Sequence, residues 1–277
     1  MNDSLRENLS YFGLHRKMLS VKKEVIAEYV SFGKHKDQYF LYYEPNEVCS
    51  DKIVIWVHGG GWNAGTPKYF DFVGQAMASY GYRFVSIGYR LSPKYKYPCQ
   101  IEDVCEGYKA VIQFLKEKNI DTSKMIVSGP SAGAHLSSIL VYNCDIQEQM
   151  NVDISKVIGF VGVGGPYSFS TKTTLSVKIL LHELFSKGYD WSKGEPCSLM
   201  NKSDIPMLLI HSKHDGLIDY SCAKLFYKKA LELGNKAELY SVEDRHNTHS
   251  WYTAGMFLES REQNKALNKL LTWIEAL

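Results

Sequence analysis

The sequence has little of what marks several classes of protein. No apolar run approaches the roughly 18 residues that a transmembrane helix needs. Residues 1–19 are polar and contain no apolar core of a secretion signal. The 32 Lys and Arg residues are interleaved with 30 Asp and Glu residues, so no basic block offers a footprint for nucleic acid. We expect a cytoplasmic protein without stable membrane insertion and without a nucleic-acid partner.

The six cysteines include no C-x-x-C pair, which disfavours a cysteine-based zinc site or a dithiol motif. A chain of 277 residues does not need disulfides to stabilise its core, so we expect free thiols in a reducing compartment. The segment HSKHD, residues 211–215, has ligand-type side chains at close spacing. No further set of carboxylates or thiols completes a zinc site around it. We expect no metal and no cofactor.

What the chain does have is an alternation of strand and helix patterns. Continuous apolar runs predict buried strands, amphipathic segments between them predict helices, and residues 25–43 predict an antiparallel edge hairpin. This order indicates a single α/β domain over residues 1–277, with a mostly parallel sheet of about eight strands. Residues 1–22 form an N-terminal helical segment, and residues 166–203 interrupt the alternation as a cap or lid insertion.

The pentapeptide GPSAG, residues 129–133, lies between a predicted strand and a predicted helix. A serine at such a turn projects above the carboxyl edge of the sheet, at the positive end of the helix. Glycines two positions away on each side let the strand and the helix pass closely. Ser131 is therefore the candidate nucleophile. The alternative is a tight turn with a capping serine.

The motif HGGGW, residues 58–62, directly follows a buried strand. Three consecutive glycines are costly in conformational entropy, and they suit a loop whose N–H groups approach an oxyanion. Gly60 and Gly61, with the amide of Ala132, are the candidate oxyanion hole. Trp62 and His58 are candidate substrate-binding residues, although packing would also explain them. A flexible loop or a phosphate cradle are the alternatives, and the spacing of a phosphate-binding loop is missing.

A nucleophilic serine needs a base, and the base needs an orienting carboxylate. In this chain order both should follow the serine, the acid before the histidine. Asp215 comes a few residues after a predicted strand, whereas Asp219 is better placed to cap the next helix. His246 and His249 both lie in the loop after the last predicted strand. We favour His246 as the base and keep His249 as the alternative.

Together, HGGGW, GYRLSP, IEDV, GPSAGAHL, HDGLID and a late loop histidine resemble the α/β-hydrolase fold. More narrowly, they resemble the esterase/lipase group of hormone-sensitive-lipase-like and acetyl-ester-type carboxylesterases, from about residue 25 to the C-terminus. The resemblance implies a three-layer α/β-hydrolase with a catalytic triad and an oxyanion hole formed by Ser131, His246, Asp215, Gly60, Gly61 and Ala132. Pro130 departs from the acid that often precedes the nucleophile in this group. Tyr89 and Arg90 in the GYRLSP stretch are expected to be structural.

The same resemblance implies a serine carboxylic-ester hydrolase that acts on small or short-chain acyl esters, such as acetyl esters. Its partner would be a small-molecule ester, and a homodimer is left open. An arylformamidase-like amide hydrolase on the same site is one alternative. A hydrolase fold that binds a ligand without catalysis is the other.

Overall fold

The computed structural model describes residues 3–171, 174–244, 246 and 248–277. Its centre is an eight-stranded sheet in the order β1-β2-β4-β3-β5-β6-β7-β8. β2 is antiparallel to both of its neighbours, and every other pair is parallel. The strands are β1 (Glu28–Ser31), β2 (Tyr39–Tyr43), β3 (Ile53–Val57), β4 (Arg83–Ile87), β5 (Met125–Pro130), β6 (Val157–Val163), β7 (Met207–Ser212) and β8 (Ala237–Val242). The mostly parallel sheet and the edge hairpin predicted from the sequence are confirmed.

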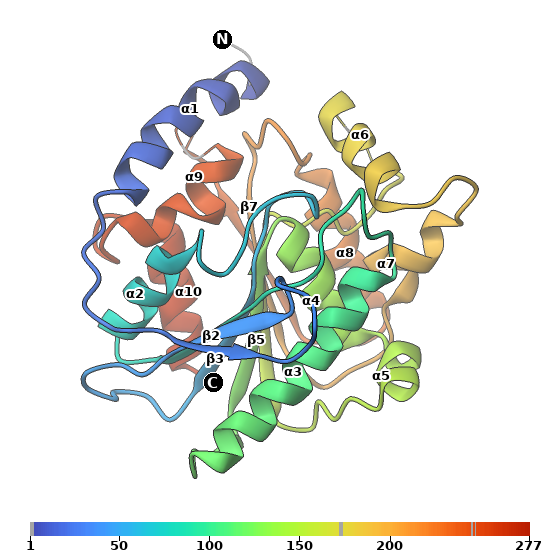
Figure 1. The fold of residues 1–277 in the computed structure, drawn as a ribbon. Helices are drawn as coiled ribbons and strands as arrows, with labels where there is room; N and C mark the ends of the chain where they lie inside the picture. The colour runs from blue at the N-terminus through green and yellow to red at the C-terminus, as the bar shows by residue number, and fades with distance from the viewer. Residues whose placement is uncertain (1–2, 172–173, 245, 247) are drawn as a thin grey trace.

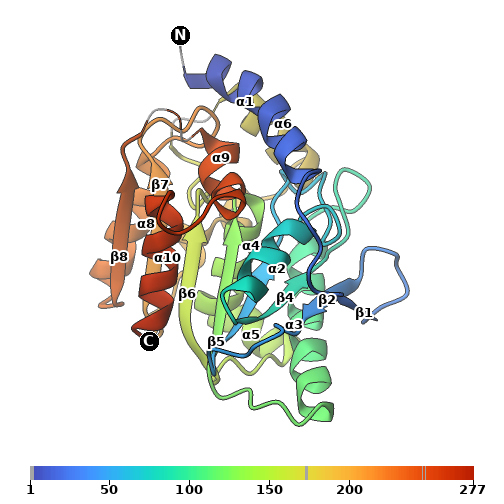
Figure 2. The same cartoon turned by 90° about the vertical axis from the view of Figure 1, so that its left-hand side faces the viewer.

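Helices cover both faces of this sheet (Figures 1 and 2). Helices α3, α4 and α8 bury apolar residues against one face, and α2, α9 and α10 against the other. The helical elements are α1 (Asp3–Met18), α2 (Asp71–Ser79), α3 (Cys99–Glu117), α4 (Ala132–Tyr142), α5 (Cys144–Met150), α6 (Leu175–Leu184), η1 (Trp191–Gly194), α7 (Pro196–Leu199), α8 (Ser221–Glu232), α9 (His249–Thr253), η2 (Gly255–Leu258) and α10 (Lys265–Glu275). The three-layer architecture follows from burial on both sides of the sheet.

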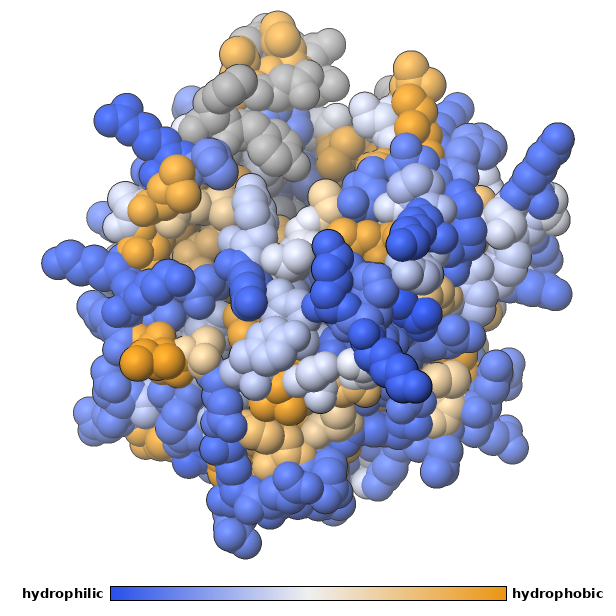
Figure 3. All heavy atoms as spheres, viewed as in Figure 1, coloured by the Kyte–Doolittle hydropathy of each residue, from blue (hydrophilic) through white to orange (hydrophobic). Residues whose placement is uncertain are grey.

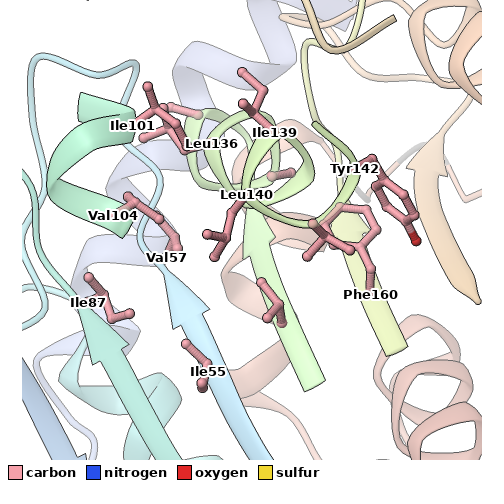
Figure 4. Close-up of a cluster of buried hydrophobic side chains, with 14 of the residues drawn as sticks. Ile55, Val57, Ile87, Ile101, Val104, Leu136, Ile139, Leu140, Tyr142 and Phe160 are labelled. Carbon is pink, nitrogen blue, oxygen red and sulfur yellow. The ribbon is translucent and has the colours of Figure 1, made fainter. Parts of the chain in front are cut away.

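The central strands are apolar on both faces because both faces are covered. In β3, Ile55 and Val57 belong to the core beneath α3 and α4, whereas Val54 and Trp56 belong to the core on the opposite side. Figure 4 shows the first of these cores, with Leu140 of α4 among the labelled side chains. Packing on both faces of the sheet holds the carboxyl ends of the strands in fixed positions. The candidate site lies at this carboxyl edge of the sheet.

A partly buried ion pair between Arg90 and Asp103 holds the chain after β4. Asp103 of α3 is 1% exposed and accepts hydrogen bonds from the backbone N–H and from the Nε and Nη2 groups of Arg90. Gln38 donates to the same carboxylate at 2.8 Å. Tyr89, directly before the arginine, donates its hydroxyl to the carbonyl of His58 at 3.1 Å. The GYRLSP stretch therefore joins β4, α3 and the loop after β3, as a structural role requires.

Two segments outside the regular alternation lie over the carboxyl edge of the sheet. The predicted N-terminal helical segment is the single helix α1, which contacts α9 (Figures 1 and 2). The predicted insertion at residues 166–203 contains α6, η1 and α7. The C-terminal part of the chain consists of α9, η2 and α10. Within the described part of the chain, no helix has the length and apolarity to cross a membrane.

Candidate active site

The turn from β5 into α4 carries Ser131 in a conformation that non-glycine residues rarely adopt, with φ 50° and ψ −122°. The flanking glycines are required by close backbone contact. A Cβ on Gly133 would lie 1.9 Å from the carbonyl oxygen of Val57, and one on Gly129 would lie 2.5 Å from the carbonyl carbon of Gly133. Only glycine therefore fits at these two positions, and the turn places the serine side chain at its apex.

Pro130 has a physical explanation in the sheet. Ser131 donates its N–H to Val163 of β6, so the preceding residue would point its N–H to the other neighbour, β3. Pairing of β3 with β5 ends at Trp56 and Ser128, before the proline is reached. A residue without an N–H consequently costs no ladder hydrogen bond at this position.

Asp215 and His249 form a direct pair at the same edge of the sheet. Nδ1 of His249 donates to Oδ2 of Asp215 at 2.7 Å, and the hydroxyl of Tyr252 donates to the same oxygen at 2.5 Å. The other carboxylate oxygen accepts the N–H groups of Leu217 and Ile218, both at 2.8 Å. The side chains and N–H groups in these contacts all donate to the carboxylate. The hydrogen bond to Asp215 fixes the orientation of the His249 ring.

The structure pairs Asp215 with His249, the alternative base, whereas the sequence favoured His246. His246 is exposed, its backbone N–H donates to the side chain of Asp244, and it lines a different groove, with Arg6, Leu9 and Ser10 of α1. His249 begins α9 and lines the same cavity as Ser131. The start of that helix turns the second histidine inward, and loop spacing alone did not reveal where the helix begins.

The pair also sets the charges at the site. Burial alone would raise the pKa of the Asp215 carboxyl, but the charge and hydrogen bond of His249 bring that pKa below its usual value. Burial alone would lower the pKa of His249, yet the charge and hydrogen bond of Asp215, with a smaller contribution from Glu7, raise it above the usual value. Asp215 is therefore ionised at neutral pH and favours a protonated imidazole next to it.

The glycine loop after β3 faces the nucleophile. Gly60 and Gly61 have φ values of 111° and 59°, which glycine adopts without a steric penalty. In the described part of the chain, the N–H groups of Gly60, Gly61 and Ala132 donate to no other group. A Cβ on Gly59 would lie 3.5 Å from the Cβ of Ser131, so the loop and the serine turn are in close contact. Unpaired N–H groups next to a partly buried serine are the donors that an oxyanion needs.

Trp62 is held by a chain of buried hydrogen bonds. Its φ is 63°, it is 2% exposed, and its Nε1–H donates to Nδ1 of His135 at 3.2 Å. The other nitrogen of His135 donates to the carbonyl of Gly194 at 2.7 Å. Burial lowers the pKa of His135 to about 4, so this histidine is neutral at physiological pH. Trp62 lines the cavity, as expected for a substrate-binding residue, and links it to the insertion.

His58 does not line the cavity, which corrects its expected role in substrate binding. Its ring stacks on Tyr89 with centroids 4.2 Å apart, and its Nδ1–H donates to the carbonyl of Gly59 at 2.7 Å. Burial lowers the pKa of His58 to about 4. The histidine is a buried, neutral residue directly before the glycine loop, and its ring packs on Tyr89.

The cavity that Ser131 and His249 share has a volume of about 610 Å³. Its wall is mostly apolar and comes from α1, the glycine loop, α6 and the loop after β7. The lining residues are Leu14, Met18, Gly60, Gly61, Trp62, Asn63, Ala64, Gly65, Thr66, Tyr69, Phe70, Ser131, Ala132, Pro166, Val177, Leu180, Leu217, Ile218, His249, Ser250 and Ala254. None of these is Asp, Glu, Lys or Arg, so the cavity suits an uncharged group of modest size.

Two functional candidates at this site, Tyr252 and Glu7, were not selected from the sequence. Tyr252 lies three positions after His249, one helical turn on, and this spacing was the only available signal. Leu180 of α6 contacts the glycine loop, because a Cβ on Gly61 would meet its Cδ1 at 2.9 Å. Glu7 of α1 accepts the backbone N–H of His249 at 2.6 Å, across 242 residues of chain. Among the described residues, no group of His, Cys, Asp and Glu side chains converges as a metal site.

A protein-family model described as BD-FAE matches residues 41–230 of this chain. The curated kynurenine formamidase of Debaryomyces hansenii is 31% identical over 139 residues, which is 46% of this chain and 45% of that protein. The carboxylesterase NlhH of Mycobacterium tuberculosis is 33% identical over 101 residues, 36% of this chain and 32% of that protein. The alignments thus span less than half the length of these curated relatives.

Solved structures with the same architecture include esterase B from Lactobacillus rhamnosis. It superposes with a TM-score of 0.80 at 19% identity, covering 99% of this chain and 93% of that one. At this level of identity the likeness establishes the fold. The α/β-hydrolase architecture expected from the motifs is confirmed.

Proposed function

This chain belongs to the BD-FAE family, and from that premise we propose that it is a serine hydrolase that cleaves small, uncharged carboxylic esters. The observation that carries the proposal is the pairing of His249 with Asp215 at 2.7 Å, on the wall of the cavity that Ser131 also lines. A buried carboxylate that orients an imidazole, on the wall of a cavity shared with a strained serine, is the arrangement of a nucleophilic triad.

The mechanism follows from the donors and acceptors at the site. Nδ1 of His249 is bonded to Asp215, so Nε2 is the nitrogen that takes the proton of Ser131 as its Oγ attacks the ester carbonyl. The N–H groups of Gly60, Gly61 and Ala132 would stabilise the oxyanion of the tetrahedral intermediate. The imidazolium then gives its proton to the departing alkoxide, and a water molecule hydrolyses the acyl-enzyme by the same steps.

A second candidate is amide hydrolysis of the arylformamidase type, which the alignment with kynurenine formamidase favours. Kynurenine is an amino acid, and derivatives of it carry a carboxylate and an ammonium group at neutral pH. The cavity wall offers no Asp, Glu, Lys or Arg to pair with either charge. The uncharged lining therefore supports esters as the better substrates.

The test compares hydrolysis of p-nitrophenyl acetate by the wild-type protein and by Ser131→Ala. Loss of the nucleophile should lower kcat by about 10⁴-fold or more, as for removal of other triad members. A fluorophosphonate probe should label Ser131 in the wild type and nothing in the variant. Equal turnover by both proteins would refute the triad and favour a fold that only binds its ligand.

A panel of esters and aryl formamides of graded acyl length then separates the two candidates. Short uncharged esters should have the higher kcat/KM. If a formamide with a charged amino-acid side is hydrolysed faster than every ester, the amide assignment replaces the ester assignment.

A further inference from the structure

A carboxylate from the N-terminal helix is bonded directly to the helix that carries His249. Oε2 of Glu7 accepts the backbone N–H of His249 at 2.6 Å, and Oε1 accepts that of Ser250 at 2.9 Å. Glu7 is 5% exposed, although it comes from a surface helix rich in polar residues. A buried carboxylate of this kind is costly unless its acceptors are fully used, and here both oxygens are used.

The helix α9 needs this partner. It is only five residues long, and its N-cap residue, Thr248, makes no side-chain cap bond to it. The first N–H groups of a helix have no partner within it, and so short a helix is unstable by itself. Glu7 satisfies two of those N–H groups and places a negative charge at the positive end of the helix.

A second residue of α1 reinforces the contact. The hydroxyl of Ser10, one turn beyond Glu7, lies 2.9 Å from that of Thr248 and 3.1 Å from that of Ser250. On its other side, α9 is bonded to Asp215 through His249 and Tyr252. The short helix is therefore held between α1 and the loop after β7.

We propose that Glu7 is a positioning residue for the catalytic base, and that α1 is a built-in part of the active site. The inference rests on the proposed function, in which His249 is that base. Glu7 itself touches neither the nucleophile nor the cavity, and it acts by fixing where the imidazole stands. Leu14 and Met18 of the same helix form part of the cavity wall, so one helix both holds the base and closes the pocket.

The charge of Glu7 should affect the pKa of His249, an effect that a role in packing alone would not produce. The groups that face His249 are Asp215, His211, Tyr252 and Glu7. Of these, Asp215 and Glu7 are anionic and favour the imidazolium. Removing the charge of Glu7 should lower the pKa of His249 and move the acidic limb of the kcat/KM profile to lower pH.

The experiment uses Glu7→Gln, which keeps the size of the side chain and replaces one acceptor oxygen by a donor. We expect kcat for p-nitrophenyl acetate to fall about 10- to 100-fold, as when a catalytic group is slightly misplaced, with KM within about twofold. The acidic limb should shift to lower pH. Arg16→Gln is the matched control, because it removes one charge from an exposed position in the last turn of the same helix and should change neither quantity.

Two further measurements keep the test decisive. NMR titration of the His249 imidazole reports its pKa without any turnover, so it tests the positioning role even if Ser131 proves not to be a nucleophile. If Glu7→Gln does not fold, Ser10→Ala removes only the hydroxyl contacts and should lower kcat with KM unchanged. A Glu7→Gln protein with a lower Tm but with kcat, the acidic limb and the His249 pKa all unchanged would overturn the proposal.

Discussion

Two donors on one short helix converge on a single oxygen of Asp215. His249 and Tyr252 are one turn apart, and both reach Oδ2 because side chains three positions apart lie on the same helix face. The second donor prevents the carboxylate from rotating away from the imidazole. The structure therefore pairs Asp215 with His249 through contacts between α9 and the loop after β7, which lie 34 to 37 residues apart in the chain.

Substitution of the two histidines tests this choice directly. His249→Ala should lower kcat by about 10⁴-fold, because the serine loses its base. His246→Ala should leave kcat within about twofold, since His246 is exposed and lies outside the cavity. The measurement is steady-state turnover of p-nitrophenyl acetate by both purified variants. A large loss in His246→Ala with little change in His249→Ala would restore the original preference.

The pH dependence follows from the raised pKa of His249. A base works only when deprotonated, so raising its pKa moves the onset of activity to higher pH. We expect kcat/KM to rise with pH through a midpoint above the usual histidine value of about 6.5. A stopped-flow profile from pH 5 to 9 on the free enzyme measures this midpoint, and a midpoint clearly below 6 would contradict the Asp215–His249 pairing.

At the scale of elements, α6 is the part of the insertion that shapes the cavity. Leu180 packs on Gly61, and the neighbouring Asn63 donates to Glu183 of the same helix at 2.7 Å. Figure 3 shows hydrophobic residues over α6 at the upper right, where Leu175 and Ile179 are exposed. The helix therefore presents apolar side chains both to the cavity and to solvent, and its inner face forms part of the cavity wall.

Shortening the inner residue should change substrate preference. Leu180→Ala widens the cavity, so kcat/KM for a bulkier ester should rise relative to acetate by about tenfold, the order expected for one or two methylene groups. Ile179→Ala is the control, because that side chain is 52% exposed and does not line the cavity. The ratio of butyrate to acetate hydrolysis in the three proteins gives the result. An unchanged ratio in Leu180→Ala would mean that another wall sets the acyl length.

At the scale of the whole molecule, the site depends on contacts that join distant parts of the chain. The Arg90–Asp103 ion pair joins α3 to the turn after β4. The neighbouring Tyr89 donates a hydrogen bond to His58, at the start of the loop that carries the glycines. These residues are far from the nucleophile in sequence and do not line the cavity. Substitution of these residues should therefore act mainly on the stability of the fold.

Asp103→Asn removes the negative partner of a nearly buried pair. We expect the free energy of unfolding to fall by about 3 kcal/mol, because Arg90 loses its charge partner. Glu106→Gln, which breaks an exposed pair on the same helix, should cost less than about 0.5 kcal/mol. Urea unfolding followed by circular dichroism measures both. Equal and small losses would show that the Asp103 pair contributes little beyond its geometry.

Local sequence patterns predicted the alternation of strands and helices, the serine turn, the glycine loop and the position of Asp215. Each of these is a local pattern: apolar runs for buried strands, glycines where backbones approach, and an acid shortly after a strand. Tertiary structure alone decided that His249 faces inward, that His58 lies beneath the loop, and that Glu7 caps α9. These outcomes depend on contacts across as many as 242 residues, and no local spacing encodes such a contact.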